Sequence, residues 1–448
     1  MNRPQPLSRL HLAHALIDGE VLANVAVDVD ASGRISAVSA GESRDTADAA
    51  LDGLALPGFA NTHSHAFHRL LRGRGDAEAG DFWAWRELMY RTAGRLNPDL
   101  YYLVARAFFA ELLEAGYTVV GEFHYLHRRP DGGAYAPQGA MAEALADAAE
   151  GAGIRLTLLD TAYLRGGLDE VGNPVAGSKA QRPFLDTPGE WIARHAQLDA
   201  IAGPLVRRGA AIHSLRAVDP GDLPALLAAM DPDEPLHAHV SEQPAENAQV
   251  RAAYGLSPVE VLAERGVLSP RFTAVHATHL TDVDIGLLAE TNSMVCMCPS
   301  TERDLGDGIG RARQLVEAGV GIAIGSDQHV VVDPFDECRQ LEGHERLATG
   351  RRSLFEPRQL LAAGTSAGYR SLGWEGGVIA PGSLADLVVI DESSARTLGT
   401  EPATSWLSAT AADVRHTVVG GAVVVRDGAH VAGAARDVLR TALEEVWK

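Results

Sequence analysis

The sequence predicts an α/β protein, a (β/α)8 TIM-type barrel that carries a small β-sandwich domain built from both chain termini. Eight apolar, strand-like runs alternate with helical stretches through the middle of the 448-residue chain. Such alternation indicates a parallel sheet, and eight repeats indicate a closed barrel. Short strand-like runs broken by turn dipeptides occupy both ends instead. We therefore expect residues 58–375 to form the barrel. Residues 1–57 and 376–448, with a C-terminal helix, are expected to form the β-sandwich domain.

The terminal segments have the pattern of short antiparallel strands. Residues 10–17, 21–29 and 34–39 are apolar-rich and are separated by Asp18-Gly19 and Ser32-Gly33, which are turn dipeptides. The same pattern of short apolar-rich runs occurs near the other end of the chain, at residues 384–390, 416–419 and 422–425, with Gly420-Gly421 as a tight turn. A final helix is expected at 434–446.

The middle of the chain supplies the barrel strands in order. The first precedes His63, and the others are expected at 119–123, 154–159, 209–215, 236–240, 272–276, 293–298 and 319–324. Helices are expected between them at 100–115, 139–152, 223–230, 258–265, 281–290 and 310–318. The long Gly- and Pro-rich loop 165–190 follows the third strand, so we expect it over the C-terminal face of the barrel.

The composition excludes several classes of protein. A formal net charge of -20 argues against a nucleic-acid surface or an anionic membrane as partner. No apolar run approaches the roughly 18 residues that span a bilayer, and the first residues lack the apolar core of a signal peptide. The three cysteines form no disulfide framework, and Cys296 and Cys298 are expected to fill a buried strand. A cytoplasmic location fits these features.

Metal-capable side chains stand where the predicted strands end. His63 and His65 form a His-x-His pair whose side chains would point the same way from a strand. His239, His276 and Asp327 end three later apolar runs. In a barrel the catalytic residues come from the C-terminal ends of different strands, and imidazole and carboxylate groups together suit a divalent metal such as zinc. The sequence therefore predicts a metal site.

This arrangement resembles the amidohydrolase superfamily. The resemblance implies that His63, His65, His239 and Asp327 hold the metal, and that Glu242 moves protons with His276 and Asp327 as further catalytic residues. Superfamily members with two metals use a lysine at the end of the fourth strand, whereas residues 211–216 contain none. One divalent ion is therefore expected, with zinc the expected element.

A closer resemblance lies in five loop segments. Residues 63–67, 82–90, 121–127, 213–216 and 239–243 resemble the formimidoylglutamate deiminase family. That resemblance implies a homodimer that hydrolyses N-formimino-L-glutamate to N-formyl-L-glutamate and ammonia in histidine degradation. Arginine suits bidentate binding of carboxylates, as a small dicarboxylate substrate requires. The implied substrate-binding residues are His68, Arg86, Tyr125, His213 and Arg216.

Two positions depart from the family pattern, and two other functions stay open. His68 stands where the family has a glutamine of the substrate pocket, and Gln328 where it often has a serine, so we expect any difference in fine substrate preference to arise at these two positions. A related deaminase acting on a purine, pyrimidine or triazine ring is the first alternative. A non-catalytic barrel that serves as a binding module is the second, and the complete set of metal-capable residues argues against it.

Overall fold

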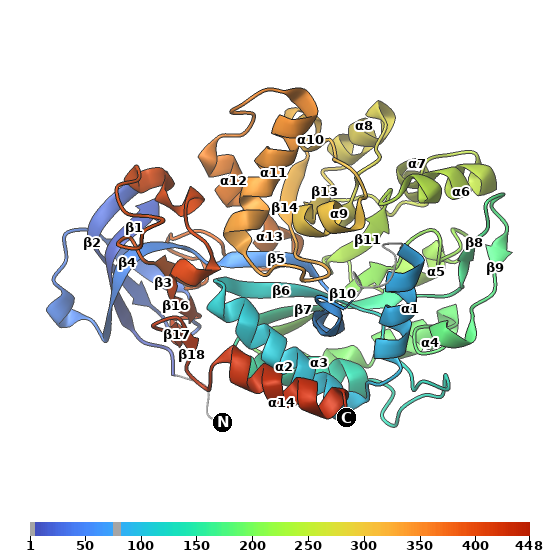
Figure 1. The fold of residues 1–448 in the computed structure, drawn as a ribbon, viewed down its shortest axis with the longest axis horizontal. Helices are drawn as coiled ribbons and strands as arrows, with labels where there is room; N and C mark the ends of the chain where they lie inside the picture. Colours follow the sequence, from blue (N-terminus) through green and yellow to red (C-terminus); the bar gives the residue numbers. More distant parts are fainter. Residues whose placement is uncertain (1–4, 75–81) are drawn as a thin grey trace.

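A computed structural model describes residues 5–74 and 82–448, with the backbone alone for residues 82–86, and it confirms the predicted fold class (Figure 1). Eight parallel strands form a nearly closed barrel, with neighbours in the order β14-β13-β12-β11-β10-β7-β6-β5. An isolated bridge between Ser64 and Asp327 joins the two edges. The strands are β5 (Phe59–Ser64), β6 (Tyr117–His124), β7 (Arg155–Ala162), β10 (Val206–Ile212), β11 (Leu236–Val240), β12 (Phe272–His276), β13 (Met294–Met297) and β14 (Gly321–Ile324).

The first barrel strand begins later than the apolar run before it. Leu54 to Leu56 lie in β4 (Ala49–Pro57), which belongs to the terminal sheet. β5 starts at Phe59, so His63 lies within the strand and His65 directly follows it. β5, β6, β7, β11, β12 and β13 are buried at every position, polar residues included, as expected of parallel strands that are covered on both faces.

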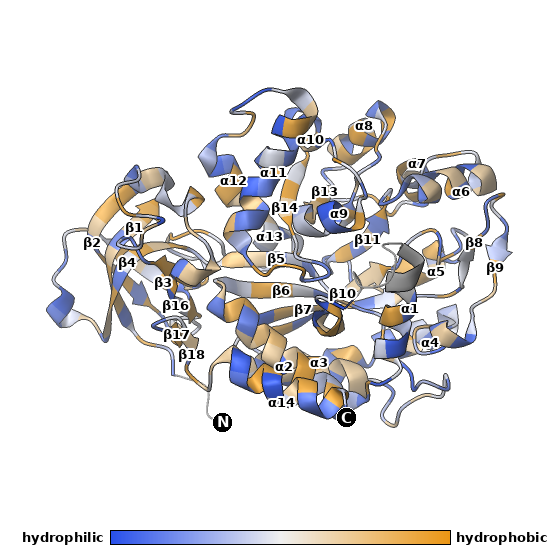
Figure 2. Ribbon diagram, in the orientation of Figure 1, coloured by the Kyte–Doolittle hydropathy of each residue, from blue (hydrophilic) through white to orange (hydrophobic). Residues whose placement is uncertain are grey.

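Helices cover the outside of the barrel. Several begin with a proline and a side-chain cap; for example, Asp333 accepts hydrogen bonds from Phe335 and Asp336 at the start of α11, a favourable helix start. In Figure 2, α14 shows both hydrophilic and hydrophobic residues, as expected of a surface helix. The helices are α1 (Phe82–Ala93), α2 (Pro98–Glu114), α3 (Ala140–Ala152), α4 (Pro188–His195), α5 (Leu223–Ala228), α6 (Pro244–Tyr254), α7 (Pro258–Glu264), α8 (Asp282–Glu290), α9 (Pro299–Leu305), α10 (Ala312–Glu317), α11 (Pro334–Thr349), α12 (Pro357–Gly364), α13 (Ser366–Ser371) and α14 (Ala435–Val446).

The two chain termini share one mostly antiparallel sheet, in the order β18-β17-β16-β15-β4-β1-β2-β3. β4 pairs in parallel with β1 and antiparallel with β15, so it joins the N-terminal strands to the C-terminal ones. Leu10, Val27, Leu387 and Val418 belong to one hydrophobic core, so both halves of the sheet pack together. The strands not yet given are β1 (Arg9–Ile17), β2 (Glu20–Val29), β3 (Ile35–Ser39), β15 (Leu387–Ile390), β16 (Val414–Val419), β17 (Ala422–Arg426) and β18 (Ala429–His430).

The C-terminal helix lies along the barrel rather than on the terminal sheet. α14 contacts α2, and its buried residues Leu439, Ala442 and Val446 are spaced three and four apart, which places them on one face of the helix.

The long loop after β7 lies on the predicted face of the barrel. It contains the short strands β8 (Gly167–Leu168) and β9 (Pro174–Val175). Arg165 donates hydrogen bonds to the carbonyls of Leu215 and Arg216, which follow β10. The first residues of the loop after β7 therefore lie at the C-terminal ends of the strands.

Two smaller expectations also have structural outcomes. Cys296, Cys298 and Cys338 are free and buried, as expected of residues that fill the core. Among the described residues, no helix is long and apolar enough to cross a membrane.

Candidate active site

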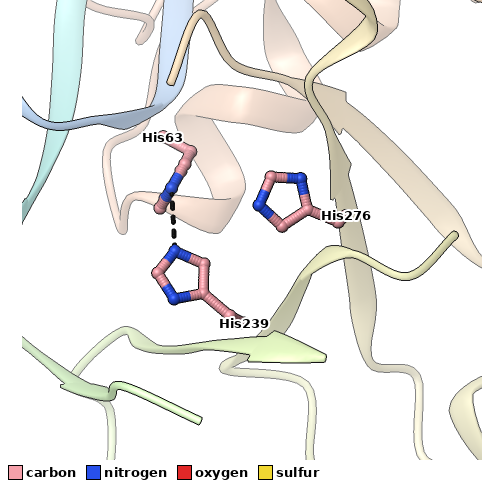
Figure 3. A group of neighbouring side chains, drawn as sticks. All are labelled: His63, His239 and His276. Atoms are coloured by element: carbon pink, nitrogen blue, oxygen red, sulfur yellow. Dashed lines mark hydrogen bonds between the residues drawn. The ribbon is translucent and has the colours of Figure 1, made fainter. Parts of the chain in front are cut away.

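Three histidines from three barrel strands converge at the C-terminal end of the barrel. Figure 3 shows the rings of His63, His239 and His276 facing one another. The Nε2 atoms of His63 and His239 are 3.2 Å apart. Each of the three offers a nitrogen within 4.8 Å of those of the other two. The strand-end positions predicted from sequence therefore meet in one place.

Asp327 and His65 complete this group. One oxygen of Asp327, Oδ1, lies 3.4 Å from Nε2 of His63 and 3.4 Å from Nε2 of His65. Their donor atoms also lie within 4.8 Å of one another. The structure thus brings together the four residues predicted to hold a metal, namely His63, His65, His239 and Asp327.

The histidines present the nitrogen that a metal requires. The Nδ1 of His65 lies 2.9 Å from the carbonyl oxygen of Phe123, and that of His239 lies 2.9 Å from the carbonyl oxygen of His213. A carbonyl can only accept, so Nδ1 carries the hydrogen in each ring and Nε2 keeps its lone pair toward the centre.

Protonation of these rings is also unfavourable. Burial lowers the pKa of His65 to about 3, and it lowers the pKa values of His63 and His239 well below their usual range. Neutral imidazoles and a carboxylate fit a divalent metal ion.

The backbone is strained where these side chains leave their strands. The φ angle is +67° at His276 and +41° at Asp327, and it is also positive at Ser241, Ala277 and His329. Residues with side chains rarely adopt this left-handed region, and such strain concentrates at functional sites. The chain leaves β11, β12 and β14 in sharp turns that direct the side chains inward.

Glu242 faces His276 across the site. Its Oε1 lies 3.8 Å from Nε2 of His276, and its Oε2 accepts a hydrogen bond of 2.8 Å from Nη2 of Arg216. Burial alone would raise the pKa of Glu242, but the charges of His276 and Arg216 outweigh it and lower that pKa. An ionised carboxylate held beside the metal-capable group can accept a proton and pass it on.

Glu302 lies behind His276 and was missed by the sequence analysis. Its Oε1 is 3.5 Å from Nδ1 of His276 and accepts a 2.8 Å hydrogen bond from the backbone N–H of Cys298. Burial opposes a charged His276 ring, but Glu242, Glu302 and Asp327 outweigh it and raise the pKa of His276 to about 10. The sequence signal was a glutamate in the first turn of α9, the helix that follows β13, a strand to which no site residue had been assigned.

Three of the predicted substrate-binding residues line the site beside the histidines. Nε2 of His68 lies 3.0 Å from the hydroxyl of Tyr125. The ring of Tyr125 lies 5.0 Å from that of His65 and 5.6 Å from that of His213. His68, Tyr125 and His213 therefore form one wall next to the metal-capable group.

The two predicted arginines have different outcomes. Arg216 reaches the site, where its Nη2 is 2.8 Å from Glu242 and 3.8 Å from Oε2 of the buried Glu246. Glu246, in the first turn of α6, was also missed, because a glutamate there is typical of a helix start. Arg86 lies in α1, and its side chain is outside the described residues.

His237 points away from the site, and its Nε2 is 3.2 Å from the carbonyl oxygen of Ser371.

Comparison with known proteins agrees with this geometry. The model of the amidohydrolase family matches residues 54–424. A formimidoylglutamate deiminase from Pseudomonas aeruginosa is 35% identical over 95% of this chain and 96% of its own length. A 5-methylthioadenosine/S-adenosylhomocysteine deaminase from Natronomonas pharaonis is 30% identical over 84% of this chain and 82% of its own.

Solved structures show the same fold. An amidohydrolase from Brucella melitensis superposes with a TM-score of 0.89 and 32% identity, covering 99% of this chain and 100% of that one. An adenosine deaminase from Xanthomonas campestris, solved with bound zinc, has a TM-score of 0.83 and 23% identity, with 99% of each chain covered. The metal-capable group and these relatives support a divalent metal and hydrolysis of a C–N bond, and the chain belongs to the amidohydrolase family as a deaminase-type member.

Proposed function

We propose that this chain hydrolyses N-formimino-L-glutamate to N-formyl-L-glutamate and ammonia. The observation that carries the proposal is the partly buried guanidinium of Arg216, which reaches Glu242 inside the site. A cation there suits a substrate with carboxylates, because a guanidinium binds a carboxylate through two parallel hydrogen bonds. The likeness to the Pseudomonas aeruginosa deiminase over nearly the whole of both chains points the same way.

The four metal-capable residues His63, His65, His239 and Asp327 would hold one divalent ion, and we propose zinc. Such an ion lowers the pKa of water and supplies hydroxide near neutral pH. Glu242 would take the proton released from the attacking water and deliver it to the departing nitrogen. The hydroxide oxygen adds to the formimino carbon. As the bond from that carbon to the terminal nitrogen breaks, the proton left on the added oxygen would also pass to that nitrogen through Asp327 or Glu242, so that ammonia leaves and a formyl group remains.

His276 would polarise and orient the attacking hydroxide. The carboxylates of Glu242, Glu302 and Asp327 raise the pKa of its ring, and its Nε2 faces Glu242. Addition to the formimino carbon moves an electron pair onto nitrogen, so a charged or hydrogen-bonding group beside the hydroxide acts on the nucleophile. His68, Tyr125, His213 and the two arginines would orient the two carboxylates of the substrate.

A second candidate is a deaminase of an adenosine-type ring. It is favoured by the relative from Natronomonas pharaonis, which covers 84% of this chain. Ammonia release from the purified, zinc-loaded protein should be measured with N-formimino-L-glutamate, N-formimino-L-aspartate, S-adenosylhomocysteine, guanine and cytosine. Turnover of a ring substrate without turnover of either formimino acid would replace our proposal with the second candidate.

Arginine variants test the carboxylate contacts directly. Truncating one partner of a buried charge pair costs about 2–5 kcal/mol. Arg216→Met and Arg86→Met should therefore each lower kcat/KM for N-formimino-L-glutamate by roughly 30-fold or more. Arg311→Met is the control, because Arg311 pairs with the exposed Asp282 outside the site.

Formamidine, which has no carboxylate, separates two roles of Arg216. If Arg216 binds substrate, Arg216→Met should impair N-formimino-L-glutamate far more than formamidine. Equal losses with both compounds would mean that Arg216 acts by holding Glu242 alone.

A further inference from the structure

The barrel closes at an irregular seam, which we define as the junction of β14 with β5. Every other neighbouring pair of barrel strands forms a ladder of several residue pairs, although the ladder of β5 with β6 shifts register between Asn61 and Ser64. At the seam, an isolated bridge joins Ser64 to Asp327. The N–H of Asp327 donates to the carbonyl of His63 at 3.0 Å, and the N–H of His65 donates to the carbonyl of Asp327 at 3.4 Å. Three of the four metal-capable residues thus lie at the weakest junction of the sheet.

Buried side chains reinforce this seam. Nδ2 of Asn61 donates to Oγ of Ser326 at 2.7 Å, and the N–H of Ser326 donates to Oδ1 of Asn61 at 2.9 Å. Nδ1 of His329 lies 2.8 Å from the same Oγ, and its Nε2 lies 3.1 Å from the carbonyl oxygen of His65. Asn61, Ser326 and His329 are fully buried, so water does not satisfy these groups.

Glu122 fixes the chain on both sides of His65. It stands on β6 and is fully buried. Its Oε2 accepts the hydroxyl of Ser64 at 2.7 Å, and its Oε1 accepts the backbone N–H of Ala66 at 2.6 Å. Ser64 and Ala66 are the two neighbours of His65 in the chain, so one carboxyl group holds the turn that carries the His-x-His pair.

We propose that Glu122 is a positioning residue of the metal site, which sets the geometry of His63 and His65 by clamping Ser64 and Ala66. The proposal rests on the metal site of the proposed function but not on the identity of the substrate. Without the carboxyl group, the N–H of Ala66 and the buried hydroxyls of Ser64 and Tyr101 would lose this acceptor. The turn would move to satisfy them, and both imidazoles would move with it. Groups that orient metal ligands from outside affect metal affinity by about 10–100-fold when they are removed.

The chain contains a matched control for Glu122. Glu337 on α11 is also buried, and its carboxyl group accepts both the hydroxyl and the backbone N–H of a single serine, Ser300. Burial raises the pKa of both glutamates to about 8. Ser300 lies at the start of α9, and neither it nor Glu337 adjoins His63, His65, His239 or Asp327 in the chain. Loss of Glu337 should therefore reproduce the packing defect without the change in ligand geometry.

The test is the Zn²⁺ affinity of the metal-free full-length protein, measured by competition with a chromogenic chelator, together with the Tm. Glu122→Met should weaken Zn²⁺ binding by about 10–100-fold. Glu337→Met should lower the Tm to a similar extent and leave Zn²⁺ affinity as in the parent. Glu122→Gln should restore most of the affinity, because its carbonyl can accept from Ala66 while its amide donates to Oγ of Ser64. Equal Zn²⁺ affinities for the two methionine variants would overturn the proposal.

Ser64→Ala provides a milder variant in case Glu122→Met does not fold. It removes one of the two clamped groups and leaves the other, so a smaller weakening of Zn²⁺ binding is expected. A folded Ser64→Ala protein with parental affinity, beside a Glu122→Gln protein that has lost affinity, would also overturn the proposal. No substrate enters these measurements, so an error in the proposed reaction would leave their outcome unchanged. Failure of the parent protein to bind Zn²⁺ would instead contradict the metal site itself.

Discussion

Two buried polar clusters in the same barrel favour different protonation states, a neutral ring for His65 in one and a charged ring for His195 in the other. We call the first the site cluster and the second the Asp160 cluster, which lies between β7, α4 and the segment before β11. The site cluster comprises His63, His65, His239, His276 and Asp327. The Asp160 cluster comprises Asp160, Asp186, Arg194, His195 and Glu234, and all ten residues are buried.

Carboxylates explain the difference between the clusters. In the Asp160 cluster, the ring nitrogens of His195 lie 3.2 Å from Asp160 and 3.2 Å from Glu234. Burial opposes a charge on His195, but these hydrogen bonds outweigh it and raise its pKa to about 9. His65 instead has a carbonyl at Nδ1, and burial lowers its pKa to about 3. A carboxylate at both nitrogens favours the charged ring, as it does for His195 and, within the site cluster, for His276. A buried histidine with a carbonyl at Nδ1 and an inward-facing Nε2 remains a potential ligand.

The largest expected effect separates chemistry from stability. Glu242→Gln should lower turnover by about 10²–10⁴-fold, because glutamine keeps the shape of the side chain but cannot carry the proton. Metal content should not change. Glu234 is a buried glutamate of the Asp160 cluster. The Glu234→Gln variant should therefore have a lower Tm and a turnover near that of the parent. Ammonia-release assays measure the turnover of both variants, and elemental analysis measures their metal content. Near-parental turnover of Glu242→Gln would show that Glu242 does not transfer the proton.

The second prediction concerns the stability of the Asp160 cluster. Arg194 donates to Oδ1 of Asp160 from Nε at 3.1 Å and from Nη2 at 3.0 Å, and it also pairs with Asp186. Breaking a buried ion pair from one side costs about 3–5 kcal/mol. Arg194→Met should reduce the free energy of unfolding in urea by that amount, whereas Arg311→Met should cost less than about 1 kcal/mol. A loss of similar size in both variants would show that burial adds nothing to the pair.

The third prediction is a pH dependence from the Asp160 cluster. The pKa of His195 is raised from 6.5 to about 9 in the folded protein, so its contribution to stability is complete below about pH 6.5. That contribution should be lost as the pH rises through about 9, and its full size is on the order of 3 kcal/mol. The stability difference between the parent and His195→Gln should shrink over this window in urea titrations. A difference that stays constant from pH 6 to 9.5 would show that His195 is neutral.

The smallest effect tests whether the two clusters are independent. A metal that binds only the folded chain should stabilise it by about 2.7 kcal/mol at a free concentration 100-fold above its Kd. The clusters share no side chain, so the increment from Zn²⁺ should agree between the parent and Arg194→Met within about 0.5 kcal/mol. Thermal melts with and without Zn²⁺ measure both increments. A clearly smaller stabilisation of Arg194→Met by Zn²⁺ would show that the two clusters are energetically coupled.

The sequence predicted what local patterns encode. The barrel strands were found because buried parallel strands are apolar runs, and His63, His239, His276 and Asp327 were found because they end or follow such runs. The division between residues 57 and 58 was expected, but the apolar pattern alone did not show that Leu54 to Leu56 pair within the terminal sheet, because Phe59 and Ala60 beyond Pro57-Gly58 are apolar too. Which sheet each run joins depends on distant partners.

Residues that act on the site from outside were not predicted. Glu122, Glu246 and Glu302 are buried, although glutamate is a mostly exposed residue. Nothing in the neighbouring sequence shows that Glu122 faces Ser64, 58 positions earlier. Arg216 was expected to face substrate, and the sequence alone did not show that it also pairs with Glu242.

The pairing of β4 with β15 has a consequence for synthesis of the protein. Roughly 330 residues separate Pro57 from Leu387, so a ribosome working at about 5–20 residues per second needs about 15–65 s to pass from one to the other. Throughout that interval the edge of β4 that will receive β15 has no partner, and unpaired apolar edges promote association between chains. Unfinished chains therefore expose an unpaired edge of the terminal sheet while the barrel is still being translated.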